Sequence, residues 1–168
     1  MEHRGAEPWR TGAALDRFAA EAERVRRALG VTNAAISVRE RGDGRLRTLV
    51  NAGLLRYGEE ARPADELYPV DSFPALVSLL EQRRPYCFGR GDPIDVSSAS
   101  LAASLGKETQ AAAPISWRGD VWGSLWVATA RDERPLTAAD LPRVVRAAHE
   151  IARLLDDIAA APAHGDAR

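Results

Sequence analysis

The chain has 168 residues, a formal net charge of −1 and 28% charged residues. This length fits one compact domain, and the balanced charge argues against the one-sided basic surface of a nucleic-acid-binding domain. The sequence has a single cysteine, no signal peptide and no apolar run of membrane-spanning length. We therefore expect a cytoplasmic protein that contacts neither nucleic acid nor membrane and has no internal disulfide.

Residues 1–12 show no periodicity, and we expect this N-terminal segment to be disordered. A helix is predicted to begin at Ala13, because apolar residues then recur every three or four positions. They form one stripe: Leu15, Phe18, Ala22, Val25 and Leu29. Gly30 follows as the C-terminal cap, since glycine adopts a positive φ without a steric clash.

The next two segments predict a β-hairpin with a glycine-rich turn at residues 42–44. In the strand at residues 34–41, one face carries Ala34, Ile36 and Val38. In the return strand at residues 45–53, one face carries Leu46, Thr48, Val50 and Ala52. The pattern then dissolves, and residues 54–70 predict a long loop of the kind that is usually functional or mobile.

Two short helices and a strand are predicted in the middle of the chain. Asp71-Ser72 caps the first helix, which ends at Arg84 because a proline follows. Residues 86–88 form the strand. Either Asp95 or Ser97 caps the second helix, which is brief.

The strongest strand signal is a second hairpin, with strands at residues 109–117 and 120–130 and a tight turn between them. Successive side chains of a strand point to opposite faces of the sheet. One face of the second strand is predicted to carry Val121, Gly123, Leu125 and Val127, and the other Trp122, Ser124, Trp126 and Ala128. Neither face is polar, so both should be covered, and Gly123 would let a helix approach closely.

The last helix is predicted from Thr137, an N-cap residue with Asp140 three positions later in a near capping box. An apolar stripe follows: Leu141, Val144, Val145, Ala148, Ala152, Leu155 and Ala159. Residues 161–168 are expected to form a disordered tail. Residues 13–160 then make up a single domain.

These elements predict an α+β fold with a largely antiparallel sheet, because hairpins occur near both ends of the domain. The first and last helices would lie together on one face of the sheet. The two middle helices and the long loop would cover the other face, where a pocket is possible.

Four segments of the chain resemble the GAF domains, which are small-molecule sensor modules of signalling proteins. They read LVSLLEQRRPYCF, AAAPISWRGDVWGSLWVA, RPLTAADL and AAHEIARLL. The resemblance spans residues 15–158 and implies a six-stranded antiparallel sheet, a ligand pocket between the sheet and the middle helices, and dimerisation through the terminal helices. It also implies seven ligand-contacting side chains: Tyr86, Phe88, Asp92, Gln110, Trp122, Ser124 and Trp126.

This chain lacks the residues that several specialised roles within the family require. Methionine sulfoxide reduction needs a second cysteine, the cyclic-nucleotide signature is absent, and bilin attachment has no cysteine or histidine in the expected setting. Cys87 is expected to be an inert core thiol, with redox sensing as the alternative. His149 is expected at the boundary of the last helical stripe rather than on a haem iron. No residues show metal-ligand spacing.

The sequence is compatible with three functions. The first is a non-catalytic regulatory sensor that dimerises and binds a small ligand or a signalling partner, with its output domain or protein acting in trans. The second is a degenerate scaffold whose filled pocket leaves only dimerisation, and the third is a redox device or enzyme based on Cys87.

Two residue-level expectations accompany these functions. The dimer interface is expected near Leu15, Phe18, Val145 and Ala148. Trp122 and Trp126 either fill the core under a helix or form an aromatic wall for a largely apolar, planar ligand oriented by Gln110, Ser124 and Asp92.

Overall fold

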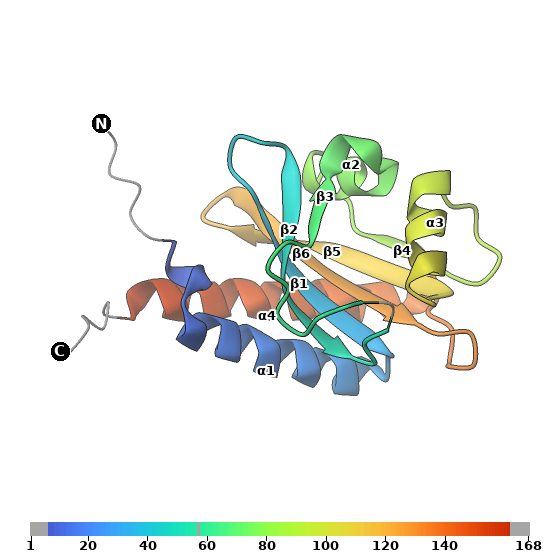
Figure 1. Ribbon diagram of the computed structural model, residues 1–168, viewed down its shortest axis with the longest axis horizontal. Helices are drawn as coiled ribbons and strands as arrows, with labels where there is room; N and C mark the ends of the chain where they lie inside the picture. Colours follow the sequence, from blue (N-terminus) through green and yellow to red (C-terminus); the bar gives the residue numbers. More distant parts are fainter. Residues whose placement is uncertain (1–6, 57, 162–168) are drawn as a thin grey trace.

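A computed structural model describes residues 7–56 and 58–161, and it contains one six-stranded antiparallel sheet with helices on both faces (Figure 1). The strands are β1 (Asn33–Arg39), β2 (Arg45–Gly53), β3 (Leu67–Pro69), β4 (Tyr86–Phe88), β5 (Thr109–Trp117) and β6 (Asp120–Thr129). They lie in the order β3-β2-β1-β6-β5-β4. The helices are η1 (Pro8–Arg10), α1 (Gly12–Leu29), η2 (Val70–Ser72), α2 (Pro74–Leu80), α3 (Val96–Ser104), η3 (Ala138–Asp140) and α4 (Leu141–Ala160). The predicted α+β class is confirmed.

The long helices α1 and α4 lie side by side on one face of the sheet, as predicted (Figure 1). Most residues of their apolar stripes are buried against the strands, and Phe18, Ile151 and Leu155 are fully enclosed. Gly30 ends α1 with a left-handed φ of 65°. Thr137 and Asp140 form the predicted capping box, in which the Asp140 carboxylate accepts a hydrogen bond from the Thr137 backbone N–H at 2.9 Å.

The opposite face carries η2, α2 and α3, which confirms the predicted layering (Figure 1). Asp95 caps α3, because its carboxylate accepts from the Ser98 N–H at 2.9 Å. Three details of the prediction were wrong. The helix α2 ends at Leu80, short of Arg84, and the expected cap at Asp71-Ser72 belongs to the 3-10 turn η2 instead. The short strand β3 lies inside the segment expected to be only loop, where it pairs with the start of β2.

The predicted faces of β6 were wrong at Trp122, because the strand contains a β-bulge. Ile115 pairs with Gly123, but the next residue of β5 pairs with Val121, so Trp122 has no partner in the ladder. An extra residue in one strand reverses the alternation beyond it. Trp122 therefore turns into the core beneath α1, and Val121 joins the cluster beneath α2.

Gly123 allows the neighbouring strand β1, rather than a helix, to approach β6 closely. A Cβ at this position would lie 1.9 Å from the backbone oxygen of Ser37 in β1, well inside van der Waals contact. A second bulge occurs where Ile36 pairs with Val50 and Ser37 pairs with Thr48. Because Leu49 is skipped, Thr48 faces α2 whereas Val50 faces α1, so the single face predicted for the return strand was also wrong.

The residues before α1 are partly ordered, although we expected disorder through residue 12. Trp9 in η1 is only 7% exposed. Its ring packs edge-to-face on Trp117 and Trp122, with centroid separations of 5.7 and 5.8 Å. The Arg10 guanidinium donates to the Glu40 carboxylate at 2.9 Å. Residues 1–6 and 162–168 of the expected disordered ends lie outside the described residues.

Candidate functional site

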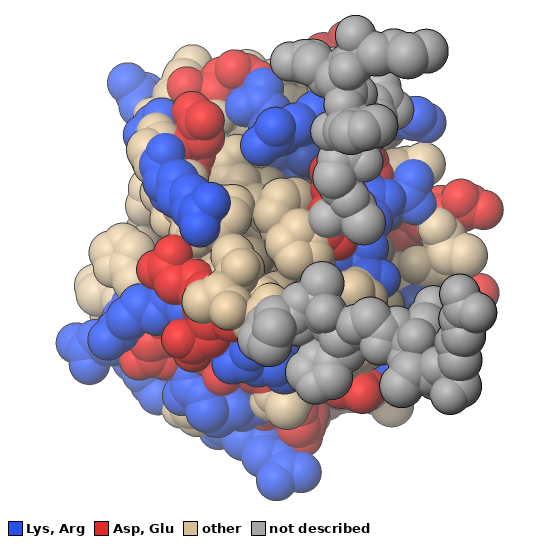
Figure 2. Space-filling model, turned by 90° about the vertical axis from the view of Figure 1, so that its left-hand side faces the viewer, with Lys and Arg blue, Asp and Glu red and all other residues tan. Residues whose placement is uncertain are grey.

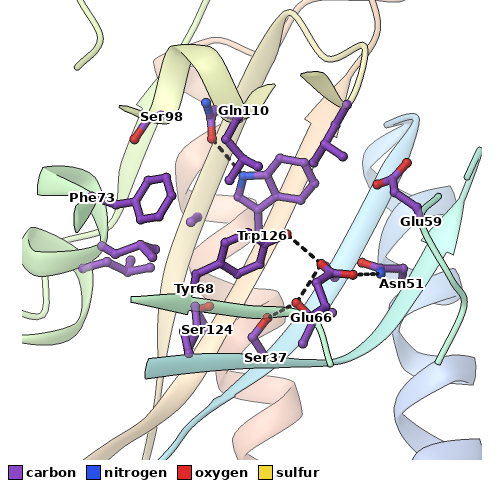
Figure 3. Close-up of a pocket in the computed structure, with 18 residues that line it drawn as sticks. Ser37, Asn51, Glu59, Glu66, Tyr68, Phe73, Ser98, Gln110, Ser124 and Trp126 are labelled. Atoms are coloured by element: carbon purple, nitrogen blue, oxygen red, sulfur yellow. Dashed lines mark hydrogen bonds between the residues drawn. The ribbon is translucent and has the colours of Figure 1, made fainter. Parts of the chain in front are cut away.

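A cavity of about 70 Å³ lies between the sheet and the layer formed by α2, α3 and the segment before β3 (residues 54–56 and 58–66) (Figure 3). Its position matches the pocket that the sequence predicted. One part of its wall is apolar and comes mainly from α2, α3 and their flanks: Leu46, Phe73, Leu76, Leu79, Leu101, Leu105 and Ala112. The remainder of the wall carries hydrogen-bonding side chains, so the cavity combines an apolar wall with a polar one.

The polar wall is organised around the carboxylate of Glu66, which immediately precedes β3. Its Oε1 accepts hydrogen bonds from the hydroxyls of Thr48 and Tyr68, each at 2.9 Å. Its Oε2 accepts from Nδ2 of Asn51 at 2.9 Å (Figure 3). Burial, together with the charge and hydrogen bond of Glu66, raises the pKa of Tyr68 well above its usual value, so this phenol stays protonated and donates.

A fixed indole forms another part of the wall. Nε1 of Trp126 donates to Oε1 of Gln110 at 2.9 Å, and this bond joins neighbouring strands of the central hairpin (Figure 3). Ser124 lies two residues before Trp126 on the same face, and Ser98 of α3 also lines the cavity. Because this part-buried hydrogen bond restricts its rotamers, Trp126 presents a defined aromatic surface to the cavity.

A buried ion pair lies beside the cavity and ties the segment before β3 to the sheet. Nζ of Lys107 lies 3.7 Å from the Glu59 carboxylate, and the two side chains are 1% and 7% exposed. Lys107 also donates to Oδ1 of Asn33, at the start of β1, and to the backbone oxygen of Leu54. Glu59 lines the cavity and Lys107 does not, so the lysine balances the charge of Glu59 from outside the lining.

Three of the seven residues suggested by the family resemblance line the cavity: Gln110, Ser124 and Trp126. Tyr86 and Phe88 share that face of the sheet, because they pair with Ala112 and Gln110, but they stack on each other at 4.9 Å outside the lining. Asp92 is exposed, and its carboxylate accepts from the Gly89 N–H in a turn. Trp122 lies on the opposite face of the sheet, so the predicted pair of indoles on one wall was wrong.

The sequence reasoning missed the residues that make the polar wall: Thr48, Asn51, Glu59, Glu66 and Tyr68. Four of them lie in or next to a segment rich in acids, glycine and proline, which resembles a solvated loop. The bulge at Leu49 decides which side chains of β2 face the cavity, and no local sequence signal marks it.

Cys87 and His149 lie away from the cavity. Cys87 is half-buried, rather than enclosed as expected, and it packs towards the core under the terminal helices. Burial and the charges of Asp140 and Asp92 raise the pKa of its thiol. His149 is exposed on α4. Within residues 7–56 and 58–161, no three His, Cys, Asp or Glu side chains come together in a way that could hold a metal ion.

A second hollow, of about 660 Å³, lies at the end of the sheet between the β1–β2 turn, the β5–β6 turn and η1. Figure 2 views this end, where positive and negative side chains are interspersed around a central area of other residues. Three of the four arginines that line it have partners: Arg39 pairs with Glu81, Arg83 donates to the Gly119 oxygen at 2.8 Å, and Arg118 lies 4.2 Å from the centre of a tryptophan ring. The hollow therefore offers no surface of one sign, and the cavity beside Trp126 is the better candidate site.

Comparisons with known proteins agree with this architecture. The model of the GAF domain family matches residues 14–155. The second GAF domain of DevS from Mycobacterium smegmatis is similar, with 18% identity, a TM-score of 0.66, and coverage of 91% of this chain and 96% of that one. The GAF domain/HD domain protein from Geobacter sulfurreducens has 17% identity, a TM-score of 0.65, and coverage of 86% and 93%.

The phycocyanobilin-bound GAF domain of a cyanobacterial phytochrome is also similar, with 19% identity, a TM-score of 0.64, and coverage of 83% of this chain and 84% of that one. No curated protein sequence matches this chain. None of the helices in the described part of the chain combines the length and apolar character needed to span a bilayer.

Proposed function

The chain belongs to the GAF domain family, whose members are generally regulatory sensor domains, and from this premise we infer that it is a non-catalytic sensor that binds a small ligand in the cavity beside Trp126. The observation that carries the proposal is the cavity itself. It lies between the sheet and the middle helices, and hydrogen-bonded side chains hold its walls in place. Small-molecule sites combine apolar walls with a few placed polar groups in this way.

The chemistry of the cavity wall favours reversible binding over catalysis or covalent attachment. Its lining residues are apolar, hydroxyl, amide and carboxylate side chains, with neither cysteine nor histidine among them. Gln110, Ser124 and Trp126 would contact the ligand directly. The single cysteine, Cys87, points to the other side of the sheet and has a raised thiol pKa, so a Cys87-based redox function has less support.

Tryptophan fluorescence during a screen of metabolites and nucleotides tests this proposal. A ligand in the cavity should quench the emission of Trp126, and Trp126→Leu should weaken binding about tenfold to hundredfold, because a buried aromatic anchor contributes most of a contact surface. Trp117→Leu is the matched control, since Trp117 lies at the far end of the hairpin. If the folded Trp126→Leu protein binds as tightly as wild type, the ligand does not occupy this cavity.

The size of the cavity favours a second candidate, a scaffold without a ligand. At about 70 Å³ it is smaller than the roughly 300 to 1,000 Å³ of typical small-molecule pockets. Under this alternative the domain acts only in dimerisation, and no compound in the screen changes its fluorescence or its melting temperature.

The proposal extends to the partners and location of the domain. We expect a homodimer formed through the terminal helices, and a cytoplasmic protein that acts on an output domain or protein in trans. Phe18 and Ala148, which we expected near the interface, are 0% and 1% exposed inside the protomer, so they cannot form a subunit contact. Leu15 and Val145 remain half-buried and available.

A further inference from the structure

We propose that the cavity selects a small organic cation, an ammonium group on a short apolar body, whose charge is balanced by Glu66. The inference rests on the proposed function of the cavity as a ligand site and specifies the ligand's chemical class. It depends on three features of the wall: the charges that line it, the acceptor capacity of one carboxylate, and the aromatic rings around it.

The charges of the wall do not cancel. Two carboxylates line the cavity, those of Glu59 and Glu66. Glu59 is compensated by Lys107, with which it forms a buried ion pair. The described residues place no Lys, Arg or His nitrogen within 4.0 Å of the Glu66 carboxylate, and its three hydrogen-bond partners are neutral. A carboxylate next to a cavity and without a counter-charge favours a cation there, because burial makes an unbalanced charge costly.

Glu66 also keeps acceptor capacity for a ligand. An ionised carboxylate offers about four lone-pair positions on its two oxygens. The hydroxyls of Thr48 and Tyr68 occupy both positions on Oε1, and the Asn51 amide occupies one on Oε2. One position on Oε2 is left for a further donor. These three bonds also fix the carboxylate, so a ligand meets it in a defined orientation (Figure 3).

The other walls suit the body of such a cation. Three aromatic rings line the cavity, those of Tyr68, Phe73 and Trp126. Tyr68 and Phe73 meet edge-to-face with their centroids 6.0 Å apart, and Trp126 is fixed by Gln110. The faces of aromatic rings attract cations, and tryptophan does so most strongly. An anion would meet the Glu66 carboxylate, which has no counter-charge beside it and repels negative charge.

The test uses three probes of similar shape and different charge: isopropylammonium, isopropanol and isobutyrate. Each is titrated into the full chain at constant ionic strength, and binding is followed by calorimetry and tryptophan fluorescence. We expect isopropylammonium to bind about tenfold or more tightly than isopropanol, because a charge-assisted hydrogen bond is stronger than a neutral one, and isobutyrate to bind most weakly. This comparison needs no variant and so does not depend on the folding of one.

Two variants test whether Glu66 causes the preference for the cation. Glu66→Gln should remove the advantage of the cation over isopropanol, whereas Glu60→Gln should retain it, because Glu60 is exposed in the same segment and loses the same formal charge. Thermal melts confirm that both variants fold. The cation inference is overturned if isopropanol or isobutyrate binds as tightly as the cation, or if the preference survives Glu66→Gln, and in both cases the cavity still stands as a ligand site. If no probe or screened metabolite binds, the proposed sensor function fails as well.

Discussion

Cys87 illustrates how the surroundings of a residue decide its reactivity. It lies in the edge strand β4 between two aromatic residues, and it is half-buried against the core under the terminal helices. Burial raises the pKa of its thiol, and the nearby charges of Asp140 and Asp92 raise it further. Thiolate is the reactive form of cysteine, so both effects suppress reaction at neutral pH.

This environment predicts slow modification of the native protein. At pH 7 we expect a thiol reagent to label folded Cys87 about tenfold or more slowly than the urea-unfolded chain, because the raised pKa leaves less thiolate and burial restricts access. The rate for the folded form should rise as pH increases beyond the usual thiol range. Cys87→Ser supplies the blank, since it removes the single cysteine. Equal labelling rates for folded and unfolded protein would contradict the inert assignment and favour a redox sensor.

At the scale of elements, the segment before β3 (residues 54–56 and 58–66) is held to the sheet by contacts at its start and middle. Near its start, the Leu54 oxygen accepts from the Asn33 side chain at 2.8 Å, and Glu59 pairs with Lys107. Further along, Nδ2 of Asn51 donates to the Glu60 oxygen at 2.9 Å. These contacts make the segment part of the cavity wall, so its position and the shape of the cavity are coupled.

The Lys107–Glu59 pair should therefore matter for stability. Glu59→Gln leaves a lysine that is 1% exposed without its counter-charge, and we expect the free energy of unfolding to fall by about 3 kcal/mol. Lys107→Met should cost a similar amount, and the double variant should recover part of the loss. Glu60→Gln, an exposed neighbour, should change stability by less than about 0.5 kcal/mol. Urea unfolding at pH 7 measures all four.

The stability of the Glu59→Gln variant should also depend on pH, and the direction of this dependence can be predicted. Burial lowers the pKa of Lys107, whereas the charge of Glu59 opposes that shift. Removing Glu59 should lower the folded-state pKa further below the unfolded value. The unfolded state then binds more protons, so the stability of the variant should rise with pH between the two pKa values. If both single variants keep wild-type stability across this range, the pair does not fix the segment.

Strands with local sequence signals were predictable from the sequence, whereas features that depend on pairing between strands were not. The strands β4 and β5 were located correctly because alternation and flanking turns are local signals. The bulges at Leu49 and Trp122 were not, because a bulge is defined by pairing with another strand. The strand β3, with three residues, is too short to show a period. The family resemblance predicted Gln110, Ser124 and Trp126 in the cavity wall, whereas the polar side chains around Glu66 depended on the missed bulge at Leu49 and the missed strand β3.

For the whole molecule, the two faces of the sheet have separate roles. The cavity occupies one face, and α1 and α4 cover the other (Figure 1). Along β6 the faces alternate, so Trp126 borders the cavity while Leu125 and Val127 are buried beneath the terminal helices. A ligand that shifted Trp126 would therefore act on the helical layer through the same strand. This arrangement gives the proposed sensor a short physical route from its site to a subunit interface.

The helical layer presents two half-buried apolar seams, one on each outer flank. Polar contacts join α1 to α4: Arg24 pairs with Glu150, Arg17 pairs with Asp157 at 3.5 Å, and Arg143 donates to the Ala28 oxygen. At about 100° per residue, Leu15 and Ala19 lie on the flank of α1 away from these contacts. On α4 the corresponding flank carries Leu141, Val145, Ala152 and Ala159. The α4 seam is the longer, so it is the better candidate for a two-fold contact.

We expect a homodimer in solution in which the α4 seam packs against its copy. Val145→Glu should shift the protein towards monomer by about tenfold or more in the dissociation constant, because a charge would be buried in the interface. Leu15→Glu introduces the same charge on the opposite flank and should leave the dimer intact. Light scattering over a range of protein concentrations measures the mass of each form. A monomeric wild-type mass at high concentration would exclude the dimer, and dissociation by Leu15→Glu alone would move the interface to α1.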